Sequence, residues 1–483
     1  DYPAAARSYE ESLKGGDPYF IDKTRYKLGW VYFNLQNYPS AIREFLGLLD
    51  EKTNQEQDLT DQNVPLAWEA LTYAALSFRN MGGPQQAAQY FQEQGSRHYE
   101  KYLYLSMGNQ YIASDDIEKG ISTYRTFMAE HPLHPMAPVF ASYILDTYIK
   151  HKQKESVLET QLSIAKQFKT ESPWFQVNDE KSRSRAKPLV RDALHQLALN
   201  AHRLAQESRK DEDYRESIQW YQEFIREFPE EPETRKMHFL LAEALYDTGQ
   251  FVEAAAAYET VAFHYPALGL DQKAGYNAIV SHEKAGGIDH LLKVVELAQS
   301  FADAFPKDPR SPDLLLKSAE VLLDQSETTK SERVLKKLLE KYPSGTMALK
   351  AHRLLGYIHT QKGHYEEARD DYGRARNLTP PENTKARGEL TKLIATVLFK
   401  LGDLHKASNR PLDAARAYAS ISEEASADDL TPIALFEAGT LYESVEQPKE
   451  ALNIYKRLIQ RVPDSPYTVK ARIRVGLLYE GEG

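Results

Sequence analysis

A period of 37 residues constrains the fold of this chain more than any other feature. When one Leu-Gly, Ala and aromatic pattern is laid over the whole sequence, the position four residues after its Leu recurs as an aromatic residue, Leu or His. These positions are Tyr32, Phe78, Tyr111, Tyr148, Leu245, Leu322, His359, His405, Tyr442 and Tyr479. Tyr111 and Tyr148, Leu322 and His359, His405 and Tyr442, and Tyr442 and Tyr479 are each 37 residues apart. Such a period predicts an array of units that each pack on their neighbours.

The stretch from Leu354 to Pro380 is the clearest single unit. Apolar and small residues at spacings of three and four predict two helices, and Gly363 separates them. Gly356 and Ala368 allow the two helices to approach closely, while Tyr372 fills the space beside them. This Leu-Gly, Ala, aromatic and late Pro pattern resembles the tetratricopeptide repeat, a helix-turn-helix unit.

The resemblance implies an all-α protein: a right-handed superhelical solenoid of antiparallel helix pairs, with about eleven to twelve hairpins. Residues 171–187 break the repeat with Pro, Asn, Asp and several basic side chains, so we expect a linker or insert there. The expected domains are an array over residues 1–170 and a second array over residues 188–483. The first residues match a second helix and the last match a first helix, so we expect both ends to lie within repeats.

Charge and cysteine content exclude several classes of function. The formal net charge is −10, which argues against nucleic acid or an anionic membrane as a partner. The chain has no Cys, which excludes disulfides, cysteine nucleophiles and thiolate zinc sites. It has no apolar run long enough for a membrane span. Its 30 Tyr residues suit an array that uses one or two aromatic side chains per repeat.

Prolines punctuate the connections between repeats and lengthen the unit beyond the family's usual 34 residues. Pro229, Pro266, Pro306, Pro343 and Pro463 each follow an aromatic residue or Val, as in FPKDPRSPD and VPDSPYTVK. This linker style resembles repeats of bacterial cell-envelope proteins, including the outer-membrane barrel-assembly lipoprotein and the Tol-Pal coordinator. The resemblance implies a periplasmic or outer-membrane-associated scaffold in a Gram-negative bacterium. A cytoplasmic protein, or an interaction module of a larger enzyme or export protein, is the alternative.

Catalytic and metal-binding patterns are incomplete in this sequence. His282-Glu283 begins a zincin-like motif, but Gly286 stands where the second His is required. His131 and His134 lie in a proline-rich loop, and Gly82-Gly83 lacks the Lys of a phosphate loop. We therefore expect no catalytic residue, no metal and no cofactor, and interpret the chain as a protein interaction scaffold.

The tetratricopeptide resemblance implies a concave groove, lined by first helices, that takes a peptide or an extended segment of a partner. In three units the corresponding positions are Tyr26, Trp30 and Phe33; Lys350, Arg353 and Tyr357; and Phe436, Thr440 and Glu443. The aromatic strip near residue 30 has two interpretations: packing beneath the preceding helix, or an exposed anchor for a partner. The Lys-Asn-Asn-Lys-Arg clamp of chaperone-binding members does not recur, which disfavours a chaperone cofactor.

Overall fold

The computed structural model describes residues 1–15, 20–53, 59, 65–263, 265, 271–424 and 429–481. The chain divides into two compact units, Asp1–Thr248 and Gly249–Gly483. All regular secondary structure in the described residues is helical, which confirms the all-α prediction. Pro266 and most of the connection before Pro65 lie outside the described residues.

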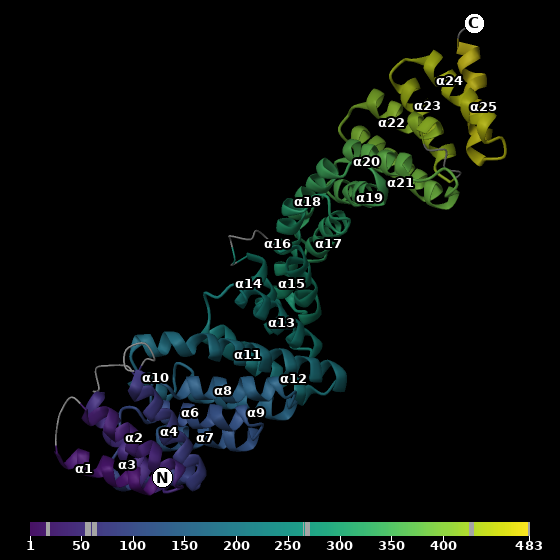
Figure 1. The fold of residues 1–483 in the computed structure, drawn as a ribbon. Coiled ribbons are helices and arrows are strands. Elements are labelled where there is room, and N and C mark those ends of the chain that lie inside the picture. Colours follow the sequence, from purple (N-terminus) through teal and green to yellow (C-terminus); the bar gives the residue numbers. More distant parts are fainter. Residues whose placement is uncertain are drawn as a thin grey trace. The chain divides into compact units, whose positions relative to one another are not determined.

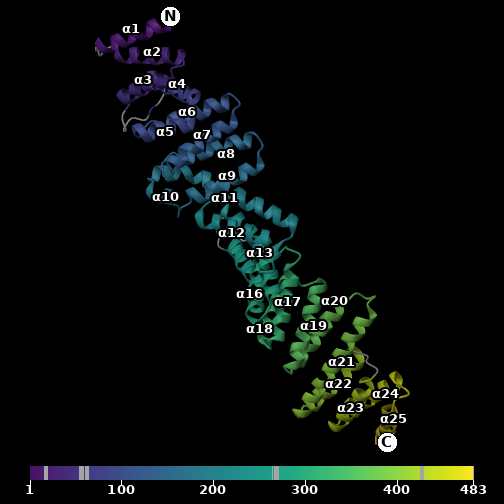
Figure 2. The same ribbon diagram turned by 90° about the horizontal axis from the view of Figure 1, so that it is seen from below.

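The first unit is a stack of consecutive helices, and each helix packs on helices that are adjacent or next to adjacent in the chain (Figures 1 and 2). Short turns join α4 to α5, α6 to α7, α8 to α9 and α11 to α12 as antiparallel pairs. The helices of this unit are α1 (Tyr2–Gly15), α2 (Ile21–Asn34), α3 (Tyr38–Lys52), α4 (Pro65–Met81), α5 (Pro84–Gln94), α6 (Glu100–Ala113), α7 (Ile117–Glu130), α8 (Ala137–Lys150), α9 (Lys154–Phe168), α10 (Pro173–Val177), α11 (Glu180–Ser208), α12 (Asp211–Glu227) and α13 (Thr234–Asp247).

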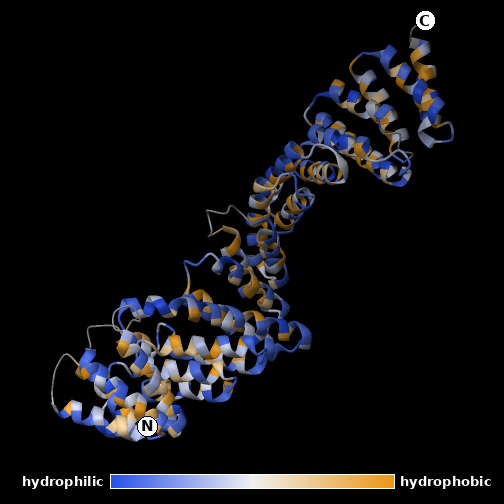
Figure 3. Cartoon of the chain, viewed as in Figure 1, coloured by the Kyte–Doolittle hydropathy of each residue, from blue (hydrophilic) through white to orange (hydrophobic). Residues whose placement is uncertain are grey.

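The second unit repeats this architecture with the same order of packing along the chain. Its helices are α14 (Phe251–Phe263), α15 (Gln272–Ala285), α16 (Ile288–Ala304), α17 (Ser311–Asp324), α18 (Thr328–Lys341), α19 (Gly345–Gln361), α20 (Tyr365–Leu378), α21 (Thr384–Ala407), α22 (Pro411–Glu424), α23 (Thr431–Ser444), α24 (Pro448–Arg461) and α25 (Pro466–Gly481). The hydrophobic cores are correspondingly local, because each cluster of buried side chains draws on helices that are close in sequence. Apolar and polar residues alternate around the helices, as Figure 3 shows.

A glycine facing an aromatic ring sets the close approach within several pairs. A Cβ atom added to Gly356 would lie 2.7 Å from the ring of Tyr372, which is 3% exposed. The same clash would arise at equivalent positions: Gly29 against Phe45, Gly108 against Tyr124, Gly402 against Tyr418, and Gly439 against Tyr455. The ring therefore occupies the volume that any larger side chain would need, as the sequence pattern predicts.

The recurring position that defines the 37-residue period has a backbone role. Its carbonyl accepts a hydrogen bond from the N–H five residues later, as from His364 to His359 and from Asp116 to Tyr111. The residue just before that donor has a positive φ, for example 75° at Gly363 and 62° at Asp115. This is the Schellman geometry that ends the first helix and starts the turn. The period in the sequence is thus the period of this helix terminus.

The prolines punctuate the array as the sequence predicts. Pro229, Pro306, Pro343 and Pro463 each stand two residues after a second helix ends, at Glu227, Ala304, Lys341 and Arg461. Proline has no N–H to donate and disfavours continuation of a helix, so these residues help to fix where the connection begins.

The segment 171–187, for which the sequence predicts a linker or insert, contains the short α10 and the first turns of α11. Ser172 caps α10 by accepting a hydrogen bond from the N–H of Phe175, and Asp179 caps α11 through the N–H of Ser182. Helix α11 continues through Pro188, past the predicted start of the second array. The two compact units are divided later in the sequence, between Thr248 and Gly249.

Candidate functional site

A groove of about 470 Å³ opens between α19 and α21 in the second unit. Its apolar surface comes from Leu349 on α19 and from Leu390 and Leu393 on α21. The turn after α20, with Pro380, closes one side. Two of the predicted groove residues, Lys350 and Arg353, line this groove with exposed side chains. It thus combines an apolar floor with a cationic edge.

The two cations of this groove differ from Lys317 and Lys406, two cations on other first helices that form ion pairs. Lys317 pairs with Glu283 at 2.5 Å, and Lys406 pairs with Glu437 at 2.8 Å, so each bridges to a neighbouring first helix. No ion pair joins Lys350 or Arg353 to another described residue. Glu389 supplies the single carboxylate of the lining, which leaves one net positive charge. An anionic group is the complement of such a site.

Tyr357, the third predicted residue on α19, does not line the groove, but it remains available to a partner. Its side chain is 48% exposed, and it follows Arg353 by one turn. It extends the exposed strip along the same face of α19.

The aromatic strip near residue 30 is a packing feature. Tyr26 is 9% exposed, and its ring lies 6.0 Å from that of Phe45. Burial, and then a hydrogen bond with Glu69, raise the pKa of the Tyr26 phenol. Trp30 packs edge-on against Tyr2, and Phe33 packs against Tyr73, so both are only partly exposed. Tyr26 is therefore corrected from a candidate groove residue to a core residue, because neighbouring helices cover its ring.

The third predicted set, on α23, is engaged within the repeat array. Phe436 packs against the rings of Tyr455 and Tyr467. The hydroxyl of Thr440 donates to the carbonyl of Glu437, and Glu443 pairs with Arg474 of α25. All three are partly exposed. The structure thus gives these side chains partners inside the chain, in contrast to Lys350 and Arg353.

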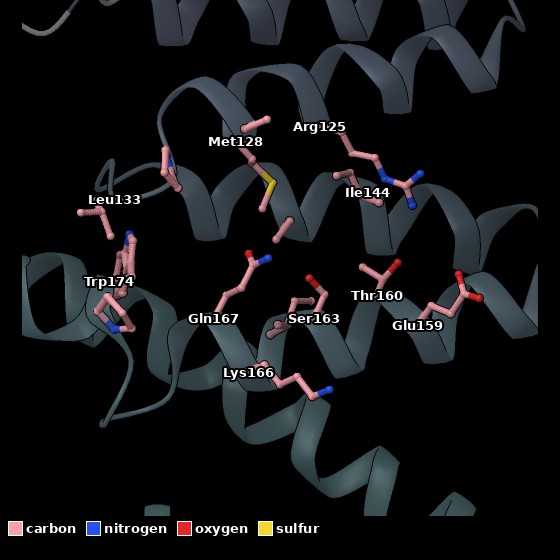
Figure 4. A pocket seen from close by; sticks show the side chains of 15 residues that line it. Arg125, Met128, Leu133, Ile144, Glu159, Thr160, Ser163, Lys166, Gln167 and Trp174 are labelled. Atoms are coloured by element: carbon pink, nitrogen blue, oxygen red, sulfur yellow. The ribbon is translucent and has the colours of Figure 1, made fainter.

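A larger cavity, of about 640 Å³, lies in the first unit between α7, α8, α9 and α10 (Figure 4). Met128 and Ile144 line its apolar side, whereas Thr160, Ser163 and Gln167 project into it from α9. It lies between the second helices of two successive repeats. The sequence pattern did not reveal this site.

The short helix α10 closes one end of the cavity with Trp174. This indole is 2% exposed, packs edge-on against Phe168, and donates its N–H to the carbonyl of His134 at 2.8 Å. The Asn178 amide donates to the carbonyls of Leu133 at 3.0 Å and Trp174 at 2.8 Å. These bonds join α10 to the loop between α7 and α8, so this end of the cavity is preformed.

Comparison with protein families identifies the repeating unit. A tetratricopeptide repeat model matches residues 202–267 and 316–381, and another matches residues 433–465. The chain contains tetratricopeptide repeats. The groove between α19 and α21 begins within one matched segment. Tetratricopeptide repeats indicate a protein–protein interaction module, so both cavities are candidate sites for a protein segment.

Two solved structures illustrate the similarity to other tetratricopeptide repeat proteins. One is a tetratricopeptide repeat protein from Parabacteroides merdae, with 12% identity, coverage of 59% of this chain and 98% of that chain, and a TM-score of 0.27. The other is the TPR domain of P58(IPK), with 11% identity, coverage of 95% and 99%, and a TM-score of 0.18. No curated protein matches the chain.

The histidines noted in the sequence have local partners within the tetratricopeptide array. His282 lies 2.6 Å from a carboxylate oxygen of Glu259 and 2.9 Å from the ring of His290. His131 bonds to the buried Glu100 at 3.0 Å. Among the described residues, no group of three or more His, Asp or Glu side chains is arranged to hold a metal ion. None of the described helices combines the length and apolar character needed to cross a membrane.

Proposed function

We propose that this chain is a non-catalytic scaffold that binds an extended, acidic segment of a partner protein in the groove between α19 and α21. The proposal rests on two exposed cations, Lys350 and Arg353, that lie beside an apolar floor. Neither has an ionic partner in the described part of the chain. First helices supply both walls of the groove.

The groove accounts for affinity and selectivity by different contacts. Apolar side chains of the segment pack against Leu349, Leu390 and Leu393 and supply most of the binding free energy. Carboxylates of the segment pair with Lys350 and Arg353, which steers association and rejects basic segments. Glu389 sits on the opposite wall and disfavours a second carboxylate there. Because both cations are exposed, binding weakens as ionic strength rises.

A differential capture experiment tests this function. The wild-type chain and a Lys350→Glu, Arg353→Glu double variant are used to capture proteins from the native cell, with quantification of each bound protein. The control is Lys385→Glu with Lys392→Glu, which makes the same charge change at exposed positions of α21 outside the groove.

Partners lost from the groove variant and retained by the control support the proposal. Their captured regions should be rich in Asp and Glu beside apolar residues. Identical partners at equal abundance on all three chains would contradict it, because the groove would then contribute nothing to recognition.

We further propose a periplasmic or outer-membrane-associated location for this scaffold. Two features support it: the proline-rich linker style of the repeats, and the complete absence of Cys. Fractionation of the native cell tests the location with an antibody against the chain. Recovery in the cytoplasmic fraction would contradict it and favour the cytoplasmic alternative.

A further inference from the structure

We infer that the cavity between α7 and α9 in the first unit is a second protein-binding site, which takes an extended segment that is apolar and uncharged at its centre. The cavity lies between second helices, on elements that the α19–α21 groove does not use. This inference goes beyond the proposed function, because an experiment can disprove binding at one site and still support binding at the other.

The wall formed by α9 carries the hydrogen-bonding groups that an extended backbone requires. Thr160, Ser163 and Gln167 follow one another along the helix and project into the cavity in Figure 4. The hydroxyl of Thr160 donates to the carbonyl of Ser156 at 2.7 Å, so its oxygen remains free to accept. The side chains of Ser163 and Gln167 form no hydrogen bond with another described residue. This row can pair with successive N–H and C=O groups of a peptide.

The opposite side is apolar and preformed. Ile144 of α8 is 4% exposed, and Met128 of α7 projects into the cavity beside it. Trp174 and Leu133 close the far end, where the bonds of Trp174 and Asn178 hold α10 in place. Its volume of about 640 Å³ is within the range of ligand sites and accommodates large apolar side chains. The thioether of Met128 adapts to different side-chain shapes.

The open end of the cavity has no net preference for charge. Arg125 and Glu159 stand there as one cation and one anion. Arg125 donates to the hydroxyl of Tyr148 at 3.1 Å, and no ion pair with another described residue involves Arg125 or Glu159. Lys166 is exposed, and its amine points away from the cavity in Figure 4. A simple anionic amphiphile would face Glu159, whereas a peptide backbone carries no net charge and suits both groups.

Selection from a random-sequence peptide library on the full chain tests this site. We expect enriched peptides with an uncharged centre and at least one large apolar residue. Ala129→Phe, which places a ring at the exposed edge of the cavity, should weaken binding of an enriched peptide by about tenfold or more. The matched control, Ala113→Phe, changes an exposed alanine at the end of α6 outside the cavity and should leave binding unchanged.

Two further variants separate the inference from a structural effect and from the proposed function. Ser163→Ala with Gln167→Met preserves most of the wall's shape but removes its hydrogen-bonding groups, so it should also weaken binding. The Lys350→Glu, Arg353→Glu variant should bind the same peptide as wild type does, whatever becomes of acidic partners.

Three results would overturn the inference. The first is that no peptide is enriched, and the second is that an enriched peptide binds wild type and Ala129→Phe equally. The third is that sodium decanoate perturbs the methyl signals of Met128 and Ile144 while no selected peptide perturbs them. The last result would show a site for a small amphiphile.

Discussion

At the residue scale, single side chains fix the geometry of each repeat. Gly356 is required because Tyr372 occupies the space beside it, and the ring is nearly fully buried. Gly373, on the other helix of the same hairpin, has open space around the position of a Cβ atom. Two glycines in one helix pair thus have different reasons to be there, and substitution separates them.

We expect Gly356→Leu to lower the free energy of unfolding by about 1–3 kcal/mol, because the added side chain overpacks against Tyr372. The matched variant Gly373→Leu should cause no loss, since its side chain extends into open space and replaces a poor helix former. Chemical denaturation of both variants measures the difference. Equal unfolding curves for the two variants would contradict the register assigned to this hairpin.

His134 makes stability depend on pH. Burial, and then the nearby Lys101 and His131 charges, lower the pKa of His134 to about 4. Its stabilising contribution is therefore complete above the unfolded-state pKa near 6.5 and is lost as pH falls towards about 4. Its ring Nδ1 accepts the N–H of Met136 at 3.0 Å, so the neutral form suits the loop.

Wild type loses stability between pH 7 and pH 4. We expect this loss to be about 2 kcal/mol smaller in His134→Asn, because asparagine retains an acceptor but does not titrate. Denaturant unfolding at a series of pH values measures this change. The same pH dependence in the variant and in wild type would show that His134 does not contribute.

At the element scale, α10 is an addition that the repeat itself does not require. It has five residues, and it is held by its contacts with the loop after α7 more than by its own length. Those contacts make the closed end of the cavity in Figure 4. A loss of α10 should therefore change the first unit locally.

We expect Asn178→Ala to cost about 1–3 kcal/mol, because the buried carbonyl of Trp174 and the partly buried carbonyl of Leu133 both lose their donor. Hydrogen exchange should speed up in α10 and in the loop around Leu133, while α2 and α3 remain unchanged. Gln176→Ala, which removes an exposed hydrogen bond to Thr170, serves as the control and should have little effect. Uniform protection in the Asn178 variant would contradict this role.

The sequence predicts the regular elements well because their signals are local. Gly356, Tyr372 and Gly363 each act within one helix pair, so their spacing suffices to predict the hairpin. The structure of residues 171–187 could not be predicted from such local spacing. The position of Trp174 depends on carbonyls of Leu133 and His134 that lie about 40 residues earlier in the chain.

The candidate sites were predictable only in part, for the same reason. Lys350 and Arg353 follow from the helical register, but their lack of ionic partners depends on which carboxylates neighbouring helices present. Tyr26 shares that register, yet Phe45 and Tyr73 cover it. The exposure of a side chain depends on the residues of the adjacent repeat that cover it. Spacing along a single helix does not reveal those residues.

At the scale of the whole molecule, stability is distributed along the array. Each cluster of buried side chains involves helices that are neighbours in sequence, and the chain forms two compact units. A solenoid of this kind behaves as a series of locally coupled repeats rather than as one core.

Gly356→Leu should therefore have a local effect in the complete chain. We expect faster hydrogen exchange in α18 to α21, which include the altered hairpin and the helices packed beside it. Exchange in α2 to α7 of the first unit should stay as in wild type. Equal acceleration in both units would contradict local coupling and indicate a single cooperative core.

The most direct test of the scaffold account is site-specific photo-crosslinking from the α19–α21 groove. A photoreactive phenylalanine analogue replaces Ala386, which lines the groove, or Gly388, which is exposed on α21 outside it. In the native cell, Ala386 should give adducts with acidic segments of a defined set of proteins, and Gly388 should not. Absence of adducts from Ala386, or the same adducts from both positions, would contradict the claim that this groove binds partner proteins.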